Sequence, residues 1–361
     1  MTAAARTEKP VLVAGRCVRE RQAGARCRAC ADACPARALS FEGPALRITA
    51  PACEGCGACA AACPRDALEF SAPGWRAVLR AIGSSGEAAC RCAKAAPGPG
   101  VPVPCIGGLS QTQRLELLQA GLRTLRMATG VCEGCPSEGR SADGAAFRTR
   151  FAEDFGATAA AFGRKVEVVL LTEPVADVDG ARRHLLGIVA RKSAAPVPLE
   201  RVGDRSPDAA AGGLLVTAGA GRRLRALRGL CASAPGTDAH AAFGALRVPV
   251  FDETKCTACG LCAAACPQHA LSARGGAQGN GREEGFFTIS AVEAACTGCG
   301  LCADICTSKA VAFGAPEAVD AWLSGRPVVK LRAKGLRRAS AWEGIVGRSF
   351  ASGFFRGGLR R

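Results

Sequence analysis

Short apolar runs alternate with helix-like segments through the middle of the chain. Three of these runs have the length and composition of strands: VPVPC (101–105), LRTLRMA (122–128) and VEVVLL (166–171). Residues 110–121 predict a helix that begins at the N-cap Ser110 and ends at Gly121, and residues 145–162 predict a second helix. Strands that alternate with helices in this order favour a small α/β domain with a parallel sheet.

Toward both ends of the chain the pattern is one of repeats. Each repeat has closely spaced cysteines, then C-[PT]-x-x-A-[LV] and residues that can form a short strand. The four repeats are CRACADACPARALSF (27–41), CEGCGACAAACPRDALEF (53–70), CTACGLCAAACPQHALS (256–272) and CTGCGLCADICTSKAVAF (296–313). Because they fall in two pairs, the sequence predicts two similar modules that flank the middle region.

The remaining segments are less regular. ARRHLLGIVARK (181–192) has the pattern of a basic amphipathic helix, and residues 193–213 are rich in Pro, Ala and Gly, as linkers are. VVKLRAK (328–334) predicts a strand or extended arm near the C-terminus. We therefore expect five parts: an N-terminal module (1–72), a small α/β domain with a cysteine site (73–172), a linker and basic helix region (173–247), a C-terminal module (248–320) and a basic tail (321–361).

Cysteine is the most unusual part of the composition, with 22 cysteines in 361 residues. We find no apolar run of about 18 residues that would span a membrane, and the N-terminus lacks the features of a secretory signal. We therefore expect the protein in the reducing cytoplasm. In that compartment, closely spaced cysteines are metal or cluster ligands rather than disulfides.

The charge pattern indicates the kind of partner. The formal net charge is +16, and the chain has 5% aromatic residues and no tyrosine. Because so few aromatic side chains are available to stack on bases, nucleic acid is disfavoured. A basic surface instead favours a protein partner with an acidic docking surface. We find no Ser/His/Asp set, paired carboxylates or phosphate-binding loop, and we assign no catalytic residue.

The four repeats resemble the bacterial-type two-[4Fe–4S] ferredoxins, whose cysteines follow the run C-x2-C-x2-C-x3-C-P. The resemblance covers residues 17–70 and 250–313. It implies two α+β, ferredoxin-like modules with four [4Fe–4S] clusters in total. In such ferredoxins the fourth cysteine of one run ligates the other cluster of the pair.

This crosswise rule implies a ligand set for each cluster. Three sets are complete: Cys53, Cys56, Cys59 and Cys34 for cluster 2; Cys256, Cys259, Cys262 and Cys306 for cluster 3; Cys296, Cys299, Cys302 and Cys266 for cluster 4. Thr307 replaces the usual proline after Cys306, which changes local rigidity but removes no ligand. Zinc is the alternative to a cluster, but paired, interleaved C-P runs are poorly explained by zinc.

The first repeat lacks its first cysteine, because Gly24 occupies that position. Cluster 1 retains Cys27, Cys30 and Cys63, and Cys17 can supply the fourth ligand across the charged insert that follows it. The alternative is a three-cysteine [3Fe–4S] site to which Cys17 does not bind.

Five further cysteines lie in the middle region: Cys90, Cys92, Cys105, Cys132 and Cys135. If EAACRC (87–92) is also a strand, they gather at the carboxyl ends of parallel strands, where ligands bind in open α/β sheets. VPCIGGL and CEGCP resemble the small iron–sulfur subunit of hydrogenase and heterodisulfide-reductase complexes, which implies a [2Fe–2S] cluster. Zinc, or thiols without metal, are the alternatives.

The favoured function is a relay of single electrons. The overall plan is similar to bacterial 4Fe–4S proteins that accompany formate dehydrogenase systems, which implies a partner of the formate dehydrogenase or hydrogenase type. One alternative is an assembly scaffold for a molybdenum enzyme. Another is a heterodisulfide-type thiol redox subunit that uses a pair such as Cys132 and Cys135.

Overall fold

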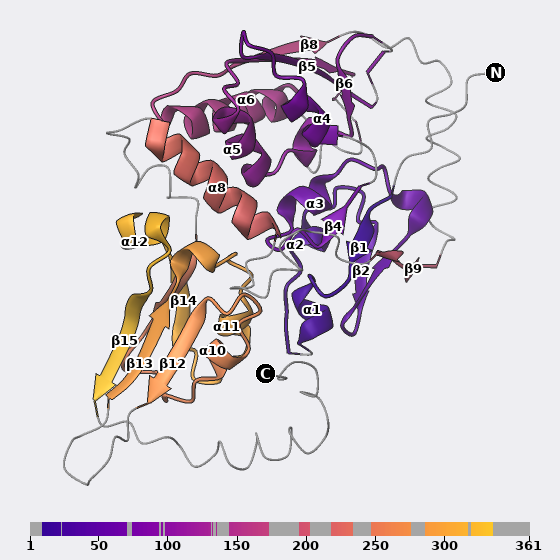
Figure 1. Cartoon of the computed structure of the whole chain (residues 1–361). Coiled ribbons are helices and arrows are strands. Elements are labelled where there is room, and N and C mark those ends of the chain that lie inside the picture. The colour runs from indigo at the N-terminus through magenta and orange to yellow at the C-terminus, as the bar shows by residue number, and fades with distance from the viewer. Residues whose placement is uncertain are drawn as a thin grey trace. The chain divides into compact units, whose positions relative to one another are not determined.

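The structure is a computed structural model in which the chain divides into two compact units, Met1–Ala245 and Leu246–Arg361 (Figure 1). It describes residues 9–22, 24–70, 74–93, 95–96, 98–130, 132, 135, 144–172, 195–202, 218–233, 247–275, 286–316 and 319–334. We describe each unit by itself. The finer division that we expect at residues 72 and 172 stays a prediction.

The N-terminal part of unit 1 contains two small sheets. One has the order β10-β1-β4 and comprises β1 (Val11–Val13), β4 (Leu68–Glu69) and β10 (Arg201–Val202). The other has the order β2-β3-β9 and comprises β2 (Leu39–Glu42), β3 (Ala45–Ile48) and β9 (Val197–Pro198). The expected linker at residues 193–213 is therefore wrong in part, because two of its segments are strands that pair with the cysteine-rich module.

Short helices carry the cysteine runs of this module. They are α1 (Val18–Arg21), α2 (Ala29–Asp32) and α3 (Ala58–Ala62), and the 3-10 turn η1 (Ala50–Ala52) precedes the second run. Apolar residues from the strands, such as Leu39 and Ile48, form the core together with the Cys30 and Cys59 side chains. The cysteine loops are thus built around the core rather than attached to its surface.

The middle of unit 1 contains the expected parallel sheet, with the order β6-β5-β7-β8. Its strands are β5 (Glu87–Cys92), β6 (Val101–Val103), β7 (Thr124–Thr129) and β8 (Glu167–Thr172). The helices are α4 (Gly74–Arg80), α5 (Gln111–Gln119) and α6 (Gly144–Ala160), and α5 contacts both others on one side of the sheet (Figure 1). Ser110 caps α5 as expected, in a reciprocal capping box with Gln113.

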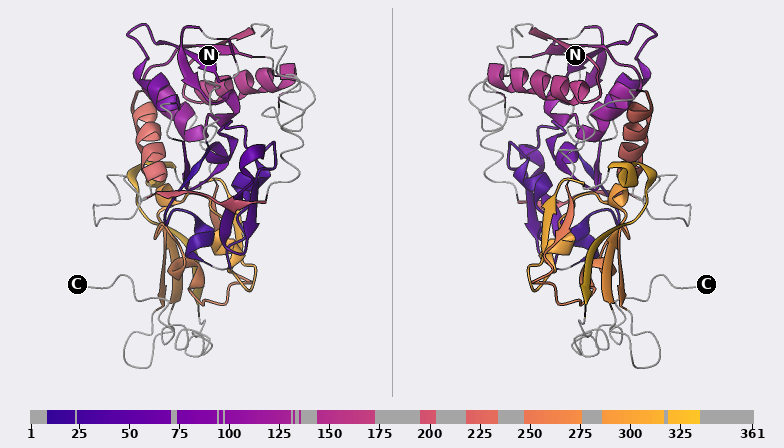
Figure 2. Two further views of the ribbon diagram at one scale, coloured as in Figure 1. Left: turned by 90° about the vertical axis from the view of Figure 1, so that its right-hand side faces the viewer. Right: turned by 90° about the vertical axis from the view of Figure 1, so that its left-hand side faces the viewer.

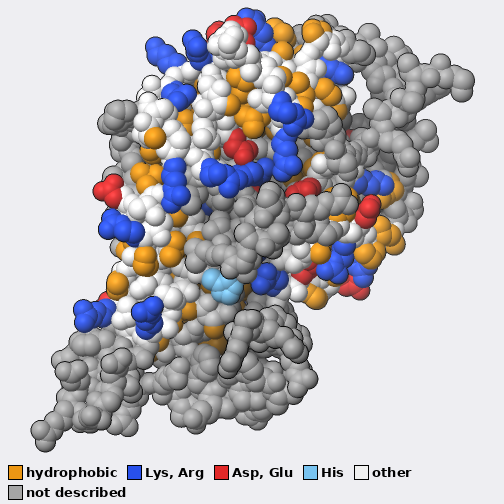
Figure 3. Space-filling view, viewed as in Figure 1, with side chains coloured by type: hydrophobic (Ala, Val, Ile, Leu, Met, Phe, Trp, Pro, Cys, Tyr) orange, Lys and Arg blue, Asp and Glu red, His pale blue; other side chains and the backbone are white. Residues whose placement is uncertain are grey.

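Unit 1 also contains α8 (Ala218–Ser233), which lies alongside α5 (Figure 2). Its buried face includes Ala226, Leu227 and Leu230. On the face shown in Figure 3, Lys and Arg side chains gather over these two helices, and Arg225 and Arg228 of α8 are exposed. The basic helix predicted at 181–192 lies outside the described residues.

Unit 2 repeats the small-sheet pattern. β11 (Val248–Phe251) pairs with β14 (Val311–Gly314), and a second antiparallel sheet has the order β12-β13-β15, with strands Leu271–Gly275, Phe286–Ala291 and Val328–Lys334. Its helices are α10 (Leu261–Ala264), α11 (Leu301–Asp304), α12 (Val319–Ser324) and the turn η5 (Glu293–Ala295). The first residues of the expected basic tail therefore belong to this unit, because they form most of α12 and all of β15.

One buried ion pair ties that strand to a cysteine loop. Lys330 of β15 pairs with Glu293 of η5, and both side chains are fully buried. Glu293 lies just before Cys296, so the pair fixes the start of the last cysteine run. Within the described residues, no helix is long and apolar enough to cross a membrane.

Candidate iron–sulfur sites

The structure brings the cysteines expected for cluster 1 together around Cys30. Burial, together with the charges of Cys63, Cys17 and Cys27, raises the pKa of Cys30 to about 12. Burial also raises the pKa of Cys63 to about 11, to which Cys17 contributes. The other three thiols of the expected set, Cys17 included, therefore all act on Cys30, and Cys17 also acts on Cys63.

The insert after Cys17 is held in place by Arg19. One Arg19 nitrogen donates to the Gly43 carbonyl at 2.8 Å, another donates to the Cys27 carbonyl at 3.4 Å, and the guanidinium lies 4.3 Å from the centre of the Phe41 ring. Val18 beside it is buried. These contacts anchor α1 to the β2–β3 hairpin, and Cys17 immediately precedes α1.

The cysteines expected for cluster 2 also act on one another's charge state, around Cys59. The pKa of Cys59 is raised first by burial and then by the charges of Cys56, Cys30, Cys53 and Cys34. Cys34, from the first repeat, therefore lies with the three cysteines of the second repeat. Cys30 belongs to the cluster 1 set, so the two sets also meet each other at Cys30 and Cys59.

Unit 2 has the same arrangement. Burial raises the pKa of Cys262 to about 12, with contributions from Cys259, Cys256 and Cys306. Burial likewise raises the pKa of Cys302, and the neighbouring thiols that raise it further are Cys296, Cys299, Cys266 and Cys262. The fourth cysteine of each repeat again lies with the other repeat's set.

The shared C-[PT]-x-x-A pattern has a geometric basis that the sequence alone did not reveal. The backbone N–H of the alanine donates to the sulfur of the fourth cysteine at 3.3 Å in three repeats, through Ala38, Ala67 and Ala310. The residue before each alanine has a positive φ: 50° at Arg37, 46° at Asp66 and 55° at Lys309. This left-handed turn aims the N–H at the sulfur, and an N–H donor stabilises a thiolate.

Cys306 shows the effect of such donors most clearly. Its burial acts to raise its pKa, but hydrogen bonds with the Ser308 hydroxyl and with the backbone amides of Ala310, Ser308 and Val311 outweigh burial and lower it. The Ser308 oxygen lies 3.5 Å from the sulfur. Ser308 directly follows Thr307, which stands where the other repeats have proline.

The middle cysteines gather at the carboxyl ends of the parallel strands. Cys90 and Cys92 lie on β5, Cys105 follows β6, and the Cys135 amide donates to the Cys132 carbonyl at 2.9 Å in a turn after β7. The pKa of Cys105 is raised by burial and then by Cys92, Cys56 and Cys135. The pKa of Cys90 is raised to about 12 by burial, and Cys92 is the thiol that adds to this shift.

No disulfide links any of the 22 cysteines, all of which lie among the described residues. Across the described part of the chain, no three His, Cys, Asp or Glu side chains converge closely enough to hold a single metal ion. A [4Fe–4S] cluster distributes its four thiolates over four iron atoms, so that its ligands are spaced more widely than those of one ion.

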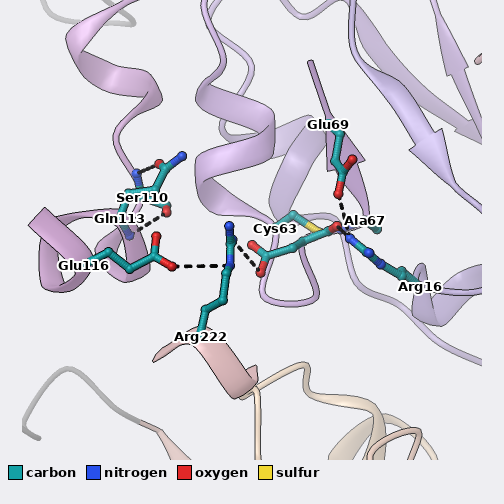
Figure 4. Close-up of polar contacts among 9 residues, drawn as sticks. Arg16, Cys63, Ala67, Glu69, Ser110, Gln113, Glu116 and Arg222 are labelled. Carbon is teal, nitrogen blue, oxygen red and sulfur yellow. Dashed lines mark hydrogen bonds and ion pairs between the residues drawn. The ribbon is translucent and has the colours of Figure 1, made fainter. Parts of the chain in front are cut away.

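A charged network connects cluster 1 to α5 and α8 (Figure 4). Arg222 of α8 lies 3.6 Å from Asp66 and 3.6 Å from Glu116 of α5. Arg16 donates to the Asp66 carbonyl at 3.0 Å and pairs with Glu69 at 2.8 Å. Burial raises the pKa of Asp66, and Arg222 and Arg16 oppose this shift. Asp66 lies three residues after Cys63, so the network lies beside the turn that carries Cys63.

Comparison with known proteins agrees with the two cysteine-rich modules. A family model for the 4Fe-4S dicluster domain matches residues 25–67 and 255–310. No curated protein matches the chain, and no solved structure matches it. The first matched segment begins after Cys17, and neither segment includes the middle cysteines. The chain therefore contains two 4Fe-4S dicluster domains, which make it an iron–sulfur, metal-binding protein.

Proposed function

We propose that this protein relays single electrons through four [4Fe–4S] clusters, two in each dicluster domain. The observation that carries the proposal is the crosswise gathering of the thiols. In all four sets, the fourth cysteine of one repeat interacts with cysteines of the partner repeat. That arrangement is the one used by two-cluster ferredoxins.

One cysteine of each expected set is buried, and these buried cysteines support electron transfer between the two clusters of a domain. Cys30 acts electrostatically on Cys59, and Cys262 acts in the same way on Cys302. All four side chains are at least nine-tenths buried. In this proposal each of these thiols ligates its own cluster, so that buried protein atoms separate the two clusters of a domain.

The middle cysteines form a further metal or redox site in this proposal. Three of them, Cys92, Cys105 and Cys135, interact, and the C-x2-C turn places Cys132 next to Cys135. A [2Fe–2S] cluster suits a relay, and zinc is the alternative. Burial raises the pKa of Cys105, which disfavours a reactive thiolate at that position.

The basic surface suggests how the relay docks. Arg225 and Arg228 are exposed on α8, and the whole chain carries a formal charge of +16. Opposite charge on a partner speeds encounter, which suits a carrier that exchanges electrons repeatedly. We propose a cytoplasmic redox partner of the formate dehydrogenase or hydrogenase type with an acidic docking surface.

Metal and sulfide content tests this function directly. After anaerobic purification, iron, acid-labile sulfide and zinc are measured per chain. Four cubes require about sixteen irons with as many sulfides, and a [2Fe–2S] cluster at the middle site adds about two irons. A preparation with little iron and several bound zinc ions would overturn the relay.

A further inference from the structure

Two loops of unit 1 are in backbone contact. One is the cysteine loop that contains Cys56 and Gly57, and the other follows β6 and contains Pro104 and Gly108. A Cβ added at Gly108 would lie 2.8 Å from the Cys56 carbonyl oxygen, and a Cβ added at Gly57 would lie 3.3 Å from the Gly108 Cα and 3.7 Å from Pro104. Real Cβ atoms do not approach a backbone oxygen so closely. Glycine at 108 is therefore what allows the two loops to meet.

Each of the touching loops carries a cysteine at the contact. Cys56 directly precedes Gly57, and Cys105 is the N-cap of η2 (Ile106–Gly108). The two thiols interact, since the charge of Cys56 raises the pKa of Cys105. On the other side of the same loop, the Cys92 thiol donates to the Pro104 carbonyl at 3.7 Å. The segment 104–108 thus lies between the cluster 2 loop and the middle cysteines.

We propose that the contact between Cys56–Gly57 and Pro104–Gly108 is the junction through which cluster 2 and a redox centre at the middle cysteines exchange electrons. The inference rests on the proposed function, because it requires an iron–sulfur centre on each side. With a cluster held at Cys56 and a redox centre held at Cys105, one electron would pass from the reduced centre to the oxidised one across this contact. No bond forms or breaks, and no proton is transferred.

The junction gives unit 1 a linear order of centres. Cluster 1 meets cluster 2 through Cys30 and Cys59, and cluster 2 meets the middle centre through Cys56 and Cys105. Cluster 2 therefore lies between the other two centres. Electrons that enter at cluster 1 leave unit 1 at the parallel sheet, or travel the same path in reverse.

The same contacts distinguish one of the middle cysteines. Cys105 interacts with Cys92 and Cys135, and Cys132 is held beside Cys135. Cys90 is buried, and among the described residues Cys92 is the thiol whose charge acts on it. Of the five middle cysteines, Cys105 lies at the backbone contact with the cluster 2 loop, and it is the one on which the junction depends.

A glycine substitution tests the junction without removing a ligand. Gly108→Ala introduces a Cβ that must push the two loops apart, whereas Gly156→Ala in α6 is the matched control, because a Cβ there meets nothing within 4 Å. A flash excites an added photoreductant, which donates an electron to the intact, cluster-loaded chain. Rapid-freeze EPR then follows how the electrons redistribute among the centres. We expect Gly108→Ala to slow exchange with the middle centre several-fold at unchanged iron content, and Gly156→Ala to behave as the wild type.

A second measurement covers the case in which Gly108→Ala loses iron. In the fully reduced wild-type chain, the unpaired spins of cluster 2 and the middle centre should broaden each other's EPR signals. Cys105→Ala should remove that broadening and the middle centre, while Cys231→Ala should change neither. The junction is overturned if exchange is as fast in Gly108→Ala as in the wild type, if Cys105→Ala leaves the cluster 2 signal unchanged, or if the middle cysteines hold no iron. Failure of the proposed function looks different, because then the dicluster signals themselves are absent.

Discussion

Cys17 and Cys30 interact electrostatically, although Gly24 occupies the position where the first cysteine of the repeat would stand. A helical turn, α1, follows Cys17 directly and is anchored by Arg19, so the insert returns the sulfur to the cluster 1 set. Cys17 lies upstream of the segment that matches the family model, and its role as the fourth ligand of cluster 1 stays a prediction.

Replacement of Cys17 should affect cluster 1 alone. Cys17→Ala leaves Cys27, Cys30 and Cys63, which can hold a [3Fe–4S] core or lose the cluster. We expect iron to fall by about one to four atoms of about sixteen per chain, with a new [3Fe–4S] EPR signal in the first case. Cys231→Ala is the control, because Cys231 lies on α8 outside the repeats in sequence and burial accounts for its raised pKa. Four intact cubes in Cys17→Ala would show that Cys17 is not a ligand.

Removal of the Arg19 anchor should loosen the same cluster. Arg19→Ala removes a hydrogen bond to Gly43 and the contact with the Phe41 ring, which together contribute about 1–2 kcal/mol to the position of α1. We expect faster release of iron from cluster 1 to a chelator, followed by visible absorbance. Arg21→Ala on the same helix is the matched control, because its hydrogen bond to Gly15 is long and exposed. Equal release rates in the two variants would contradict the role of Arg19.

Arg222 should tune the reduction potential of cluster 1. Arg222→Gln removes a positive charge that lies 3.6 Å from both Asp66 and Glu116. The more negative potential near Cys63 should stabilise the oxidised cluster and lower its reduction potential. The measurement is made at alkaline pH, because burial raises the pKa of both carboxylates. Arg126→Gln, an exposed change on β7, should leave that potential in place. A cluster 1 potential equal to that of the wild type in Arg222→Gln would exclude this coupling.

Cluster affinity should increase with pH. In the absence of a cluster, burial raises the pKa of Cys30 and of Cys262 to about 12, so at neutral pH these thiols are protonated and must lose a proton to bind iron. Each such proton makes affinity rise about tenfold per pH unit, up to the raised pKa. Competition with a chelator at pH 6.5 and 8.5 measures this dependence. Affinity that does not change between the two pH values would argue against thiolate ligation at these positions.

The sequence predicted well those features that depend on residue spacing. The two dicluster segments follow from the repeat pattern, and the parallel sheet follows from apolar runs such as VEVVLL, which became β8. The helix predicted at 110–121 ends at Gln119, but its Ser110 cap is present.

Features that depend on long-range contact were not predictable in the same way. β9 and β10 are two-residue strands in a Pro-rich segment, too short to show any periodicity, and they exist because β3 and β1 offer free edges. The junction between Cys56 and Cys105 depends on close approach of Gly57 and Gly108, which are distant in sequence. Arg222 reaches Asp66 only because α8 packs on α5.

A redox titration monitored by EPR tests the central claim most directly. The anaerobically purified chain is reduced stepwise, and each paramagnetic centre is counted by spin integration. The relay predicts four [4Fe–4S] centres that each accept one electron, in two pairs whose signals interact within each dicluster domain. A chain that accepts no electrons in this way, or whose cysteine sets hold zinc in place of iron, would contradict the account.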